Sequence, residues 1–479
     1  MKCRGVAASE TTSNRTARLP STSETQSPRS KKQDRSVFDE FVHGESAGGI
    51  VLFAFTALAL AWANSPWSDS YFALWHSTMS IGYGESALTM TIHHWINDGL
   101  MVVFFLLVGL EIKREFRVGE LASRRLAALP IAAAIGGMVL PAALYFALNA
   151  GTEGARGWAI PMATDIACAL GVIALLGARA PAGLKVFVAA LAIVDDIGAI
   201  LVIALFYTAS ISQTAIAAAI GTALVLFGCK KAGVRNPGAY AVLGVVLWLA
   251  FLSSGIHATV AGVLLALLIP ATTRIDEDEF LLDARESLME FQGASSPTAR
   301  SVLSNTGQQE ALRLLEVAVD KVQSPLLKME HSLHGPVSFV ILPIFVLANA
   351  GVQLNSAMFS TLSWRVVVGI MLGLIVGKVI GVTAASLAAV RVGWASLPAT
   401  VRGRDIFGAS WVTGIGFTMS LFIANLAFGE GPLLDSAKIA VIFASLIAGV
   451  AGWFFLHKSA ASSPVGDSAD ANGPGAGLA

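Results

Sequence analysis

Apolar positions are gathered into long runs along most of the chain, and short polar segments separate one run from the next. Stretches such as 48–63, 126–150 and 434–457 hold little or no charge over about 20 residues, the length that an α-helix needs to cross a bilayer. The pattern predicts an all-α polytopic membrane protein with twelve transmembrane helices, at 46–64, 95–112, 126–150, 158–177, 184–207, 212–229, 237–252, 256–272, 334–353, 365–390, 405–428 and 434–457.

Composition agrees with this pattern. Hydrophobic residues make up 55% of the chain and charged residues 13%, whereas about 25% is usual in soluble domains. The mean hydropathy is +0.68. Formal net charge is zero, so electrostatics give no reason to expect a nucleic-acid partner. The three cysteines are scattered and form neither a metal-binding nor a disulfide pattern.

The basic residues predict the orientation of the spans. With the N-terminus inside, 28 of the 32 Lys and Arg residues fall on inner segments, and the outer loops are almost free of them. This bias is typical of the cytoplasmic side of membrane proteins, so we expect both termini in the cytoplasm.

Three segments outside the spans are expected on the cytoplasmic side. Residues 1–45 are polar and basic and lack the apolar core of a signal peptide, which predicts a disordered arm. The other two are a loop insert at 273–330 and a disordered tail at 459–479. The insert separates helices 1–8, within 46–272, from helices 9–12, within 331–458.

On the outer side, 65–94 is too polar to cross the membrane, and the alternation of residues around Ser80–Ser86 predicts a small exposed hairpin.

Four ionisable residues interrupt the predicted spans: Asp165, Asp195, Asp196 and Lys378. A charge at the bilayer centre costs about 2.5 to 3.5 kcal/mol on insertion scales, so each one needs an explanation. A structural ion pair explains Lys378 and one aspartate. The set as a whole keeps unpaired negative charge in a medium of low dielectric constant, which favours binding of protons or of a cation.

Asp195 and Asp196 are consecutive, so on a helix they point about 100° apart. One can line a cavity while the other reaches a neighbouring helix that carries Lys378. Burial and mutual repulsion favour the neutral form of a carboxyl group, so one of the two is expected to titrate near cytoplasmic pH. Deprotonation then exposes hard oxygen ligands, which suit a small cation.

Two predicted spans contain helix-breaking residues at similar depth. Pro161 and the polar pair Thr164-Asp165 interrupt the fourth span, and Gly414 and Gly416 interrupt the eleventh. Small residues at either place alone would be explained by tight helix packing. Because the two spans are the middle members of 3–5 and 10–12 and cross in opposite directions, the pair favours an inverted-repeat transporter with broken helices. Asp165 is expected to offset the positive ends of the half-helices, and Lys378 the negative ends.

Long stretches of the chain resemble the NhaA family of sodium/proton antiporters, a known example of that architecture. The resemblance covers about 45–272 and 329–457. It is carried by WINDGLMVVFFLLVGLEIKRE (95–115), GWAIPMATDIACALG (157–171), LAIVDDIGAI (191–200), SGIHATVAGV (254–263), LPIFVLANAGV (342–352) and GIGFTMSLFIANLAFG (414–429). It implies exchange of cytoplasmic sodium or lithium for external protons, regulated by pH, by a homodimer in a bacterial inner membrane, with no organic cofactor and with lipid as its surroundings.

By that resemblance Asp196 is the central cation ligand, with Asp195 beside it in contact with Lys378, and Thr164 and Asp165 lie where the broken helices cross. Positions tied to the funnel or the pH response are matched by Asp98, Glu111, Glu115, His257, Glu330, His331 and His334. The chain departs from the family at Cys168, where Phe is usual, and at His334-Gly335-Pro336, where His-Pro-Trp is usual. These departures put the pH set-point in question, but not ion exchange.

The histidines also have simpler explanations. Exposed histidines at a membrane edge are common, and a usual pKa of about 6.5 makes His331 and His334 no more than plausible sensors. His257 follows Ser253-Ser254-Gly255, so a helix cap or a subunit contact explains it equally well.

Other functions fit the sequence less well. An intramembrane aspartyl protease needs one carboxylate from each of two helices, whereas here the pair is consecutive, and Gly408-Ala-Ser410 only weakly resembles a serine-type site. A buried lysine beside the site would obstruct a cation channel. The main alternative is a proton- or sodium-coupled carrier of an organic anion on the same fold, which would need a further polar cavity.

Overall fold

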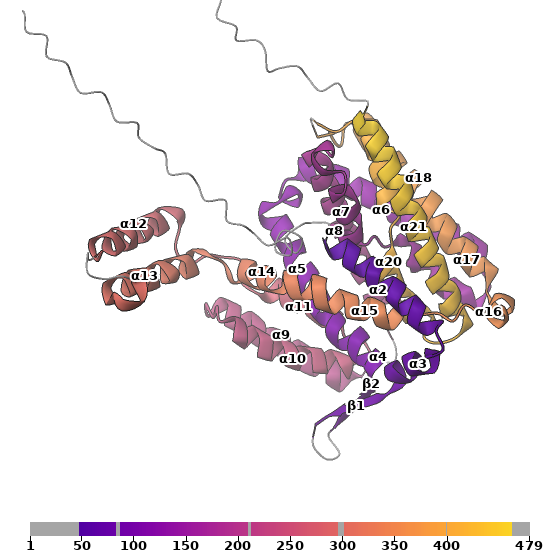
Figure 1. The fold of residues 1–479 in the computed structure, drawn as a ribbon, viewed down its shortest axis with the longest axis horizontal. Helices are drawn as coiled ribbons and strands as arrows, with labels where there is room; N and C mark the ends of the chain where they lie inside the picture. The colour runs from indigo at the N-terminus through magenta and orange to yellow at the C-terminus, as the bar shows by residue number, and fades with distance from the viewer. Residues whose placement is uncertain (1–46, 83–86, 209–211, 296–300, 399, 462–479) are drawn as a thin grey trace, which may run out of the picture. The chain divides into compact units, whose positions relative to one another are not determined.

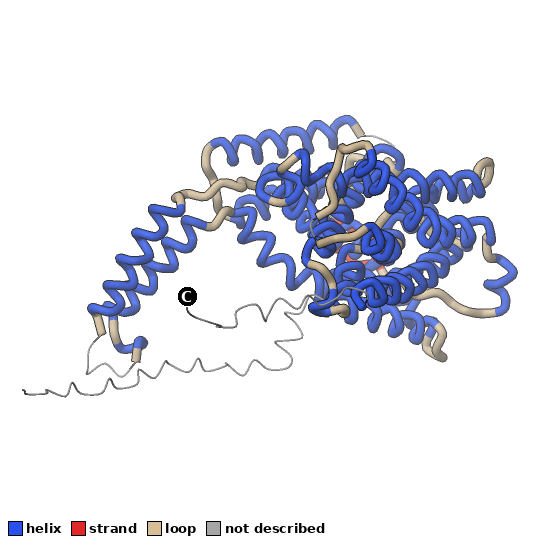
Figure 2. Tube along the Cα trace, turned by 90° about the horizontal axis from the view of Figure 1, so that it is seen from above, coloured by secondary structure: helices blue, strands red, loops and turns tan. Residues whose placement is uncertain are grey.

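The computed structural model describes residues 47–82, 87–208, 212–295, 301–398 and 400–461. The expected arm at 1–45 and the tail beyond residue 461 lie outside the described residues. The described chain is helical apart from its loops and one two-stranded sheet (Figures 1 and 2).

Short 3-10 or π-helical segments carry the label η. The first part of the chain contains α2 (Ala47–Ala63), α3 (Ser68–His76), β1 (Thr78–Ile81), β2 (Leu88–Thr91), α4 (Ile92–His94), η2 (Trp95–Leu100), α5 (Met101–Val118), η3 (Glu120–Ala122), α6 (Arg124–Asn149), η4 (Glu153–Met162), α7 (Ile166–Ala174), η5 (Gly177–Arg179), α8 (Ala182–Phe206), α9 (Gln213–Lys231), α10 (Pro237–Leu252) and α11 (Val260–Leu268). The second part contains α12 (Glu277–Gly293), η6 (Val302–Ser304), α13 (Thr306–Val322), α14 (Pro325–Pro336), η7 (Val337–Ile341), α15 (Leu342–Asn349), α16 (Ser356–Thr361), α17 (Trp364–Met371), η8 (Leu372–Gly377), α18 (Lys378–Arg391), α19 (Gly403–Val412), α20 (Phe417–Phe428) and α21 (Pro432–Ala461).

Among the described residues, seven continuous helices are long and apolar enough to cross a membrane, or up to ten if each of three bent pairs is one span. Three of the seven run through π-helical turns, at 92–118, 325–349 and 364–391. The chain is therefore a multi-pass helical membrane protein. Large apolar side chains on outward-facing helix surfaces, such as Leu205 and Val242, are exposed as contact with lipid requires.

The two predicted helix breaks are present. η4 and α7 meet at a bend of 40°, and α19 and α20 at a bend of 49°. The second break needs glycine because its backbone approaches a neighbouring helix closely: a Cβ at Gly414 would lie 2.6 Å from the carbonyl oxygen of Leu374. The breaks also touch each other, since the Asp165 amide donates to the Ile415 carbonyl at 2.7 Å.

The stretch 65–94 contains the predicted hairpin. β1 and β2 pair antiparallel with Thr78 opposite Thr91, and Ile81 opposite Leu88. A short helix that the sequence pattern did not predict, α3, precedes them and turns by 110° from α2. The buried Tyr71 anchors α3, because its hydroxyl donates to the Leu347 carbonyl at 2.7 Å.

The insert folds as a helical hairpin in which α12 and α13 lie side by side (Figure 1). It is closed at its base: the Arg274 amide donates to the Lys321 carbonyl at 2.9 Å, and the Leu326 amide to the Pro270 carbonyl at 3.2 Å. α14 begins at Pro325, so residues 325–330, which the sequence pattern assigns to the insert, belong to the following membrane helix.

Candidate ion-binding site

The site is built on α8, whose sequence is apolar except near its start and at the pair Asp195-Asp196 in its middle. These two neighbouring residues are 0% and 1% exposed. The side chains before and after them pack into the core of the bundle, so the helix holds both carboxyl groups away from solvent. Such burial is costly for a carboxylate unless a partner offsets its charge.

Lys378 supplies that partner for Asp195. Its side chain is fully buried at the start of α18, and its Nζ lies 2.5 Å from Oδ2 of Asp195. The same Nζ donates to the Thr164 hydroxyl at 2.9 Å. The predicted contact between Lys378 and one of the two aspartates is therefore present, and it involves Asp195.

Thr164 joins this pair to the second helix break. Its hydroxyl lies 2.6 Å from Oδ2 of Asp195 and 2.9 Å from the Thr413 carbonyl, which belongs to the C-terminal end of α19. One hydroxyl proton serves one of these acceptors at a time. Lys378 itself bonds to Thr164 and Asp195, so it reaches that end of the helix through Thr164.

Asp196 has different surroundings. Among the described residues no hydrogen bond or ion pair reaches its carboxyl group, and its buried Oδ1 is unsatisfied. Oδ1 of Asp195 is also buried without a partner. Unpaired buried polar atoms are rare in native structures and often mark a functional group.

Asp165 caps two half-helices at once. Its Oδ1 accepts from the Cys168 amide at 2.9 Å at the start of α7. Its Oδ2 accepts from the Thr418 amide at 3.0 Å and from the Thr418 hydroxyl at 2.5 Å at the start of α20. A carboxylate between two helix N-termini stabilises both, because each end carries partial positive charge.

The predicted funnel and pH-response residues lie in separate places. On the side that faces the insert, Arg114 of α5 lies 2.6 Å from Glu330 of α14 and 3.3 Å from Glu115. Glu111 is half-buried one turn earlier on α5. Asp98 lies on the same helix, about 20 Å from Glu111. Its Oδ1 atom is 3.5 Å from Nε2 of His257.

Of the three predicted histidines, only His257 belongs to one of these groups. His331 and His334 are exposed, and within the described part of the chain neither side chain makes a hydrogen bond or an ion pair. The His257 ring bonds the Thr259 hydroxyl at 3.1 Å, next to the start of α11, but it also faces Asp98.

Three further residues bond to predicted residues but were not predicted from sequence themselves: Thr413, Thr418 and Arg114. The first two supply the carbonyl that meets Thr164 and the groups that bind Asp165. Isolated threonines in a span are common and give little signal. Arg114 was detectable in principle, since it stands between Glu111 and Glu115 in the stretch EIKRE.

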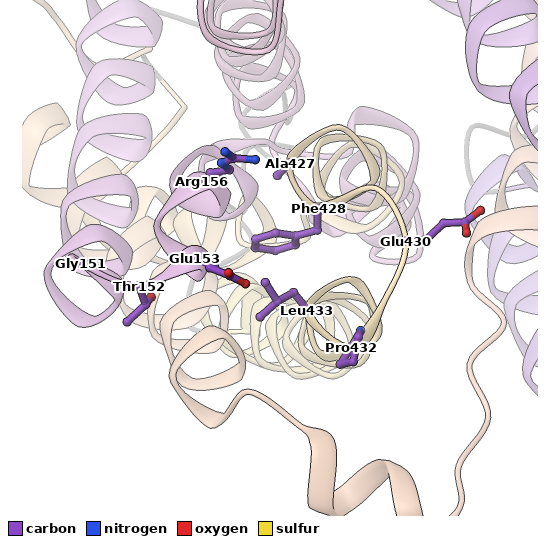
Figure 3. Close-up of a pocket in the computed structure, with 9 residues that line it drawn as sticks. All are labelled: Gly151, Thr152, Glu153, Arg156, Ala427, Phe428, Glu430, Pro432 and Leu433. Atoms are coloured by element: carbon purple, nitrogen blue, oxygen red, sulfur yellow. The ribbon is translucent and has the colours of Figure 1, made fainter. Parts of the chain in front are cut away.

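A separate cavity of about 680 Å³ lies between the start of η4, the end of α20 and the start of α21. Figure 3 shows Arg156, Phe428 and Leu433 gathered there, while Glu430 points away. None of the predicted site residues lines it. Among the described residues, no group of three or more His, Cys, Asp or Glu side chains is placed to hold a metal ion.

The central cluster contains more carboxyl groups than it can pair internally. Asp165 is bonded to helix ends and Asp195 to Lys378, so Asp196 is the one acidic group of the described cluster that lacks a partner. A buried carboxyl group in that situation either keeps a proton or binds a cation. The arrangement therefore suits alternate binding of a proton and a small hard cation.

Comparison with known proteins identifies the family of this chain. The family model "Na+/H+ antiporter 1" matches residues 39–456. A Na(+)/H(+) antiporter NhaA of Koribacter versatilis is 50% identical over 426 residues, which is 89% of this chain and 92% of the relative. Proteins of the same name from Oleidesulfovibrio alaskensis and Sulfurimonas denitrificans are 47% and 44% identical, over 88% and 89% of this chain and 93% and 96% of their own lengths. The chain therefore belongs to the NhaA family of Na+/H+ antiporters.

Proposed function

We propose that this protein exchanges cytoplasmic sodium or lithium for external protons, with Asp196 as the group that binds each in turn. The observation that carries the proposal is the unpaired, fully buried carboxyl group of Asp196 beside the paired Asp195 and Lys378. The family relationship supports the same ions, because the relatives are named as Na+/H+ antiporters.

In this scheme Asp196 loses its proton to the cytoplasm and binds a sodium ion, with Asp195 and Thr164 as further oxygen ligands. Binding sodium through Asp195 requires its oxygens to be shared with Lys378, or Lys378 to release them. After the site opens to the other side, an external proton displaces the cation. Because proton and cation compete for the same oxygens, transport is expected to rise as the pH increases.

The proposed topology has twelve spans with both termini in the cytoplasm of a bacterium, within its inner membrane. The seven long helices and the two broken helices account for nine spans, and α2, α10 and α11 are proposed as the other three. The repeats would be α6, η4–α7 and α8 against α17–α18, α19–α20 and α21. A similar interruption in the middle member of each triplet supports this division. We further propose a homodimer surrounded by lipid.

We further propose that the predicted funnel and pH-response residues regulate access of ions to Asp196. Arg114, Glu115 and Glu330 form a charged cluster on the side of the α12–α13 insert. Asp98 and His257 form another on the side of the β1–β2 hairpin. Glu111 lies between them on the same helix. These positions, with the exposed His331 and His334, are where a pH response would be sought.

An organic-anion carrier receives no support from a specific contact. The cavity in Figure 3 is separate from Lys378, and two of its charged lining residues are the acids Glu153 and Glu430. The test is the collapse of a proton gradient in everted membrane vesicles on addition of sodium, lithium, potassium or taurocholate. We expect sodium and lithium to collapse it and potassium to do so far less. A response to taurocholate alone would overturn the proposal.

A further inference from the structure

A polar cluster lies between several helices on the side of the β1–β2 hairpin. It contains one histidine and three asparagines: His93 in α4, Asn97 in η2, Asn349 at the end of α15 and Asn425 in α20. Asn97 and Asn349 are buried, and the other two are half-buried. Polar side chains in membrane spans often bond one helix to another, so a purely structural role is the first explanation to consider.

Asn349 is the centre of this cluster. Its Oδ1 accepts from Nδ2 of Asn425 at 2.9 Å and lies 2.9 Å from Nε2 of His93. Its Nδ2 donates to Oδ1 of Asn97 at 3.0 Å and to the Phe345 carbonyl of its own helix at 2.9 Å. Of these four bonds, only the one from Asn425 reaches α20.

The contact with α20 can separate without stranding a polar group. If α20 moves away, Asn349 keeps its three other bonds, and Nδ2 of Asn425 keeps its bond to the Leu421 carbonyl at 2.8 Å. Oδ1 of Asn425, which is buried and has no hydrogen-bond partner among the described residues, would then gain water. Because an unsatisfied buried acceptor costs about as much as a hydrogen bond contributes, the closed contact is held weakly, as repeated opening requires.

An apolar contact lies one turn deeper on the same face of α20. Phe422 stands three residues before Asn425 and is fully buried. Its ring centroid lies 5.4 Å from that of Phe105 in α5 and 6.2 Å from that of Phe345 in α15. One turn further in, Asp165 binds the start of α20. Polar and apolar contacts of α20 therefore lie in series between the hairpin side and the ion-binding site.

We propose that this contact, made by Asn425 and Phe422 of α20, is the outer gate of the transport path, and that Asn349 is the residue on which it closes. α20 belongs to the second proposed repeat, whereas α4, η2, α5 and α15 lie outside both repeats. The contact therefore joins the part of the bundle that holds the central carboxyl groups to the part that does not. Opening of the site to the outside separates the two parts here.

This inference rests on the exchange and the topology proposed above, and it names the residues that carry one step of that exchange. A buried asparagine elsewhere provides a matched comparison. Nδ2 of Asn149 joins α6 to the Arg365 carbonyl in α17 at 3.1 Å, and both helices belong to the proposed repeats. A bond of that kind stays within the moving part, so its loss should not open the gate.

The gate can be measured in the full-length protein by pulsed electron paramagnetic resonance between spin labels at Glu153→Cys and Ser253→Cys. Both positions are exposed and lie far from the cluster in sequence. Cys3 and Cys229 are first replaced by Ser, while the buried Cys168 is kept.

Each label reports on one of the two parts. Glu153 lies on η4, to which α20 is bonded by the Ser420 hydroxyl at 2.7 Å from the Ile160 carbonyl. Ser253 lies at the end of α10, which is bonded to η2 by Nε1 of Trp248 at 2.7 Å from the Asp98 carbonyl. The distance between the labels therefore changes when α20 separates from η2 and α15.

We expect Asn349→Leu to add a second distance to that of the parent, because the polar groups of His93 and Asn425 then face an apolar side chain unless water enters. Asn349→Ser removes the same acceptor more mildly and should shift the distribution in the same direction. Asn349→Asp keeps an acceptor oxygen in either protonation state and should match the parent. The control Asn149→Leu should lower the melting temperature but leave the distances unchanged.

A reversible bridge tests whether α20 must move during exchange. In Asn349→Cys with Asn425→Cys, a mercuric ion should join the two thiols, because the side-chain ends of the parent residues are 2.9 Å apart. We expect exchange in everted vesicles to be lost on bridging and regained when excess thiol removes the ion. The two single-cysteine variants, treated in the same way, give the effect of the ion without a bridge.

Three results would overturn the inference. The first is the parent distribution in both Asn349→Leu and Asn349→Ser. The second is an equal shift in Asn149→Leu, which would mean that any lost buried bond loosens the bundle. The third is exchange by the bridged pair at the rate of the unbridged pair. If the parent itself exchanges no sodium, the proposed exchange fails, whereas the distances still decide whether Asn349 holds this contact closed.

Discussion

Asp195 and Asp196 are neighbours in sequence, yet their carboxyl groups have different surroundings. Asp195 accepts from Lys378 and Thr164, whereas Asp196 has no partner among the described residues. The difference follows from the 100° between consecutive helix positions, which turns one side chain toward α18 and the other away from it. Paired and unpaired carboxyl groups in one cluster are what alternate binding of proton and cation needs.

The pair of Lys378 and Asp195 leads to a prediction about stability. Removing one member of a buried pair costs about 3 to 5 kcal/mol, because the survivor stays buried without compensation. We expect Lys378→Gln alone, or Asp195→Asn alone, to lower the melting temperature more than the two changes together. Thermal melting of the purified variants in detergent, analysed as a double-mutant cycle, measures the coupling. Additive losses would mean that the contact contributes no net pairing energy.

At this scale the sequence indicates the charged residues well and their uncharged partners poorly. Asp165, Asp195, Asp196 and Lys378 stand out because a charge in an apolar run demands an explanation. Thr413 and Thr418 do not, because a threonine in a span is ordinary and its role depends on which distant helix end it meets. Pairing between α18 and α8 is likewise a product of packing, and spacing alone does not specify it.

The two helix breaks depend on a carboxylate and on glycine at particular places. Asp165 serves as N-cap for α7 and accepts two bonds from Thr418 at the start of α20. Each N-cap contributes about 0.5 to 2 kcal/mol. Loss of this one side chain therefore affects two helices, and through them the relative position of the two breaks.

We predict that Asp165→Ala destabilises the protein by about 1 to 4 kcal/mol, the sum of two lost caps. Thr418→Val keeps the backbone donor and the shape of the side chain, so it should cost only about 1 kcal/mol, as for one hydrogen bond. Chemical or thermal denaturation of both variants in the same detergent gives the comparison. Equal losses from the two changes would show that Asp165 does not cap two helices.

Element boundaries were predicted unevenly, for local physical reasons. Pro161 correctly indicated the break between η4 and α7, and Gly414 and Gly416 the break between α19 and α20. Proline and glycine disfavour helical structure in any helix interior. The start of α14 was placed too late, although Ser324 followed by Pro325 is a typical N-cap and first-turn sequence. α11 is shorter than expected because the chain turns before it, with Gly255 at φ +84°.

On the scale of the whole molecule, the fold class follows from sequence and the arrangement of the helices does not. Apolar runs predict that the chain crosses a membrane many times, and the described helices bear this out. Which helices meet is a matter of tertiary packing: α6 lies against α18 closely enough that a Cβ at Gly136 would clash with the Gly381 carbonyl, at 2.2 Å. Uniformly apolar spans carry no pattern that would reveal such pairs.

The proposed topology predicts which residues face each aqueous compartment. Single cysteines at Glu153 and Glu430 should react with a membrane-impermeant thiol reagent added to intact cells. Cysteines at Glu290 in the insert and at Arg402 before α19 should react only in everted vesicles. Labelling of Glu290→Cys in intact cells would place the insert, and with it the charged cluster around Glu330, outside the cytoplasm and would contradict the proposed topology.

Competition between proton and cation at Asp196 is tested most directly by sodium binding to the purified protein at several pH values. For the unaltered protein we expect binding to release protons and the apparent affinity to fall as the pH is lowered, by up to tenfold per unit where one proton competes with one cation. Asp196→Asn, whose amide keeps the volume but carries no charge, should neither bind sodium nor exchange it, while its melting temperature stays close to that of the parent. Sodium binding of unchanged strength and pH dependence in Asp196→Asn would contradict the account.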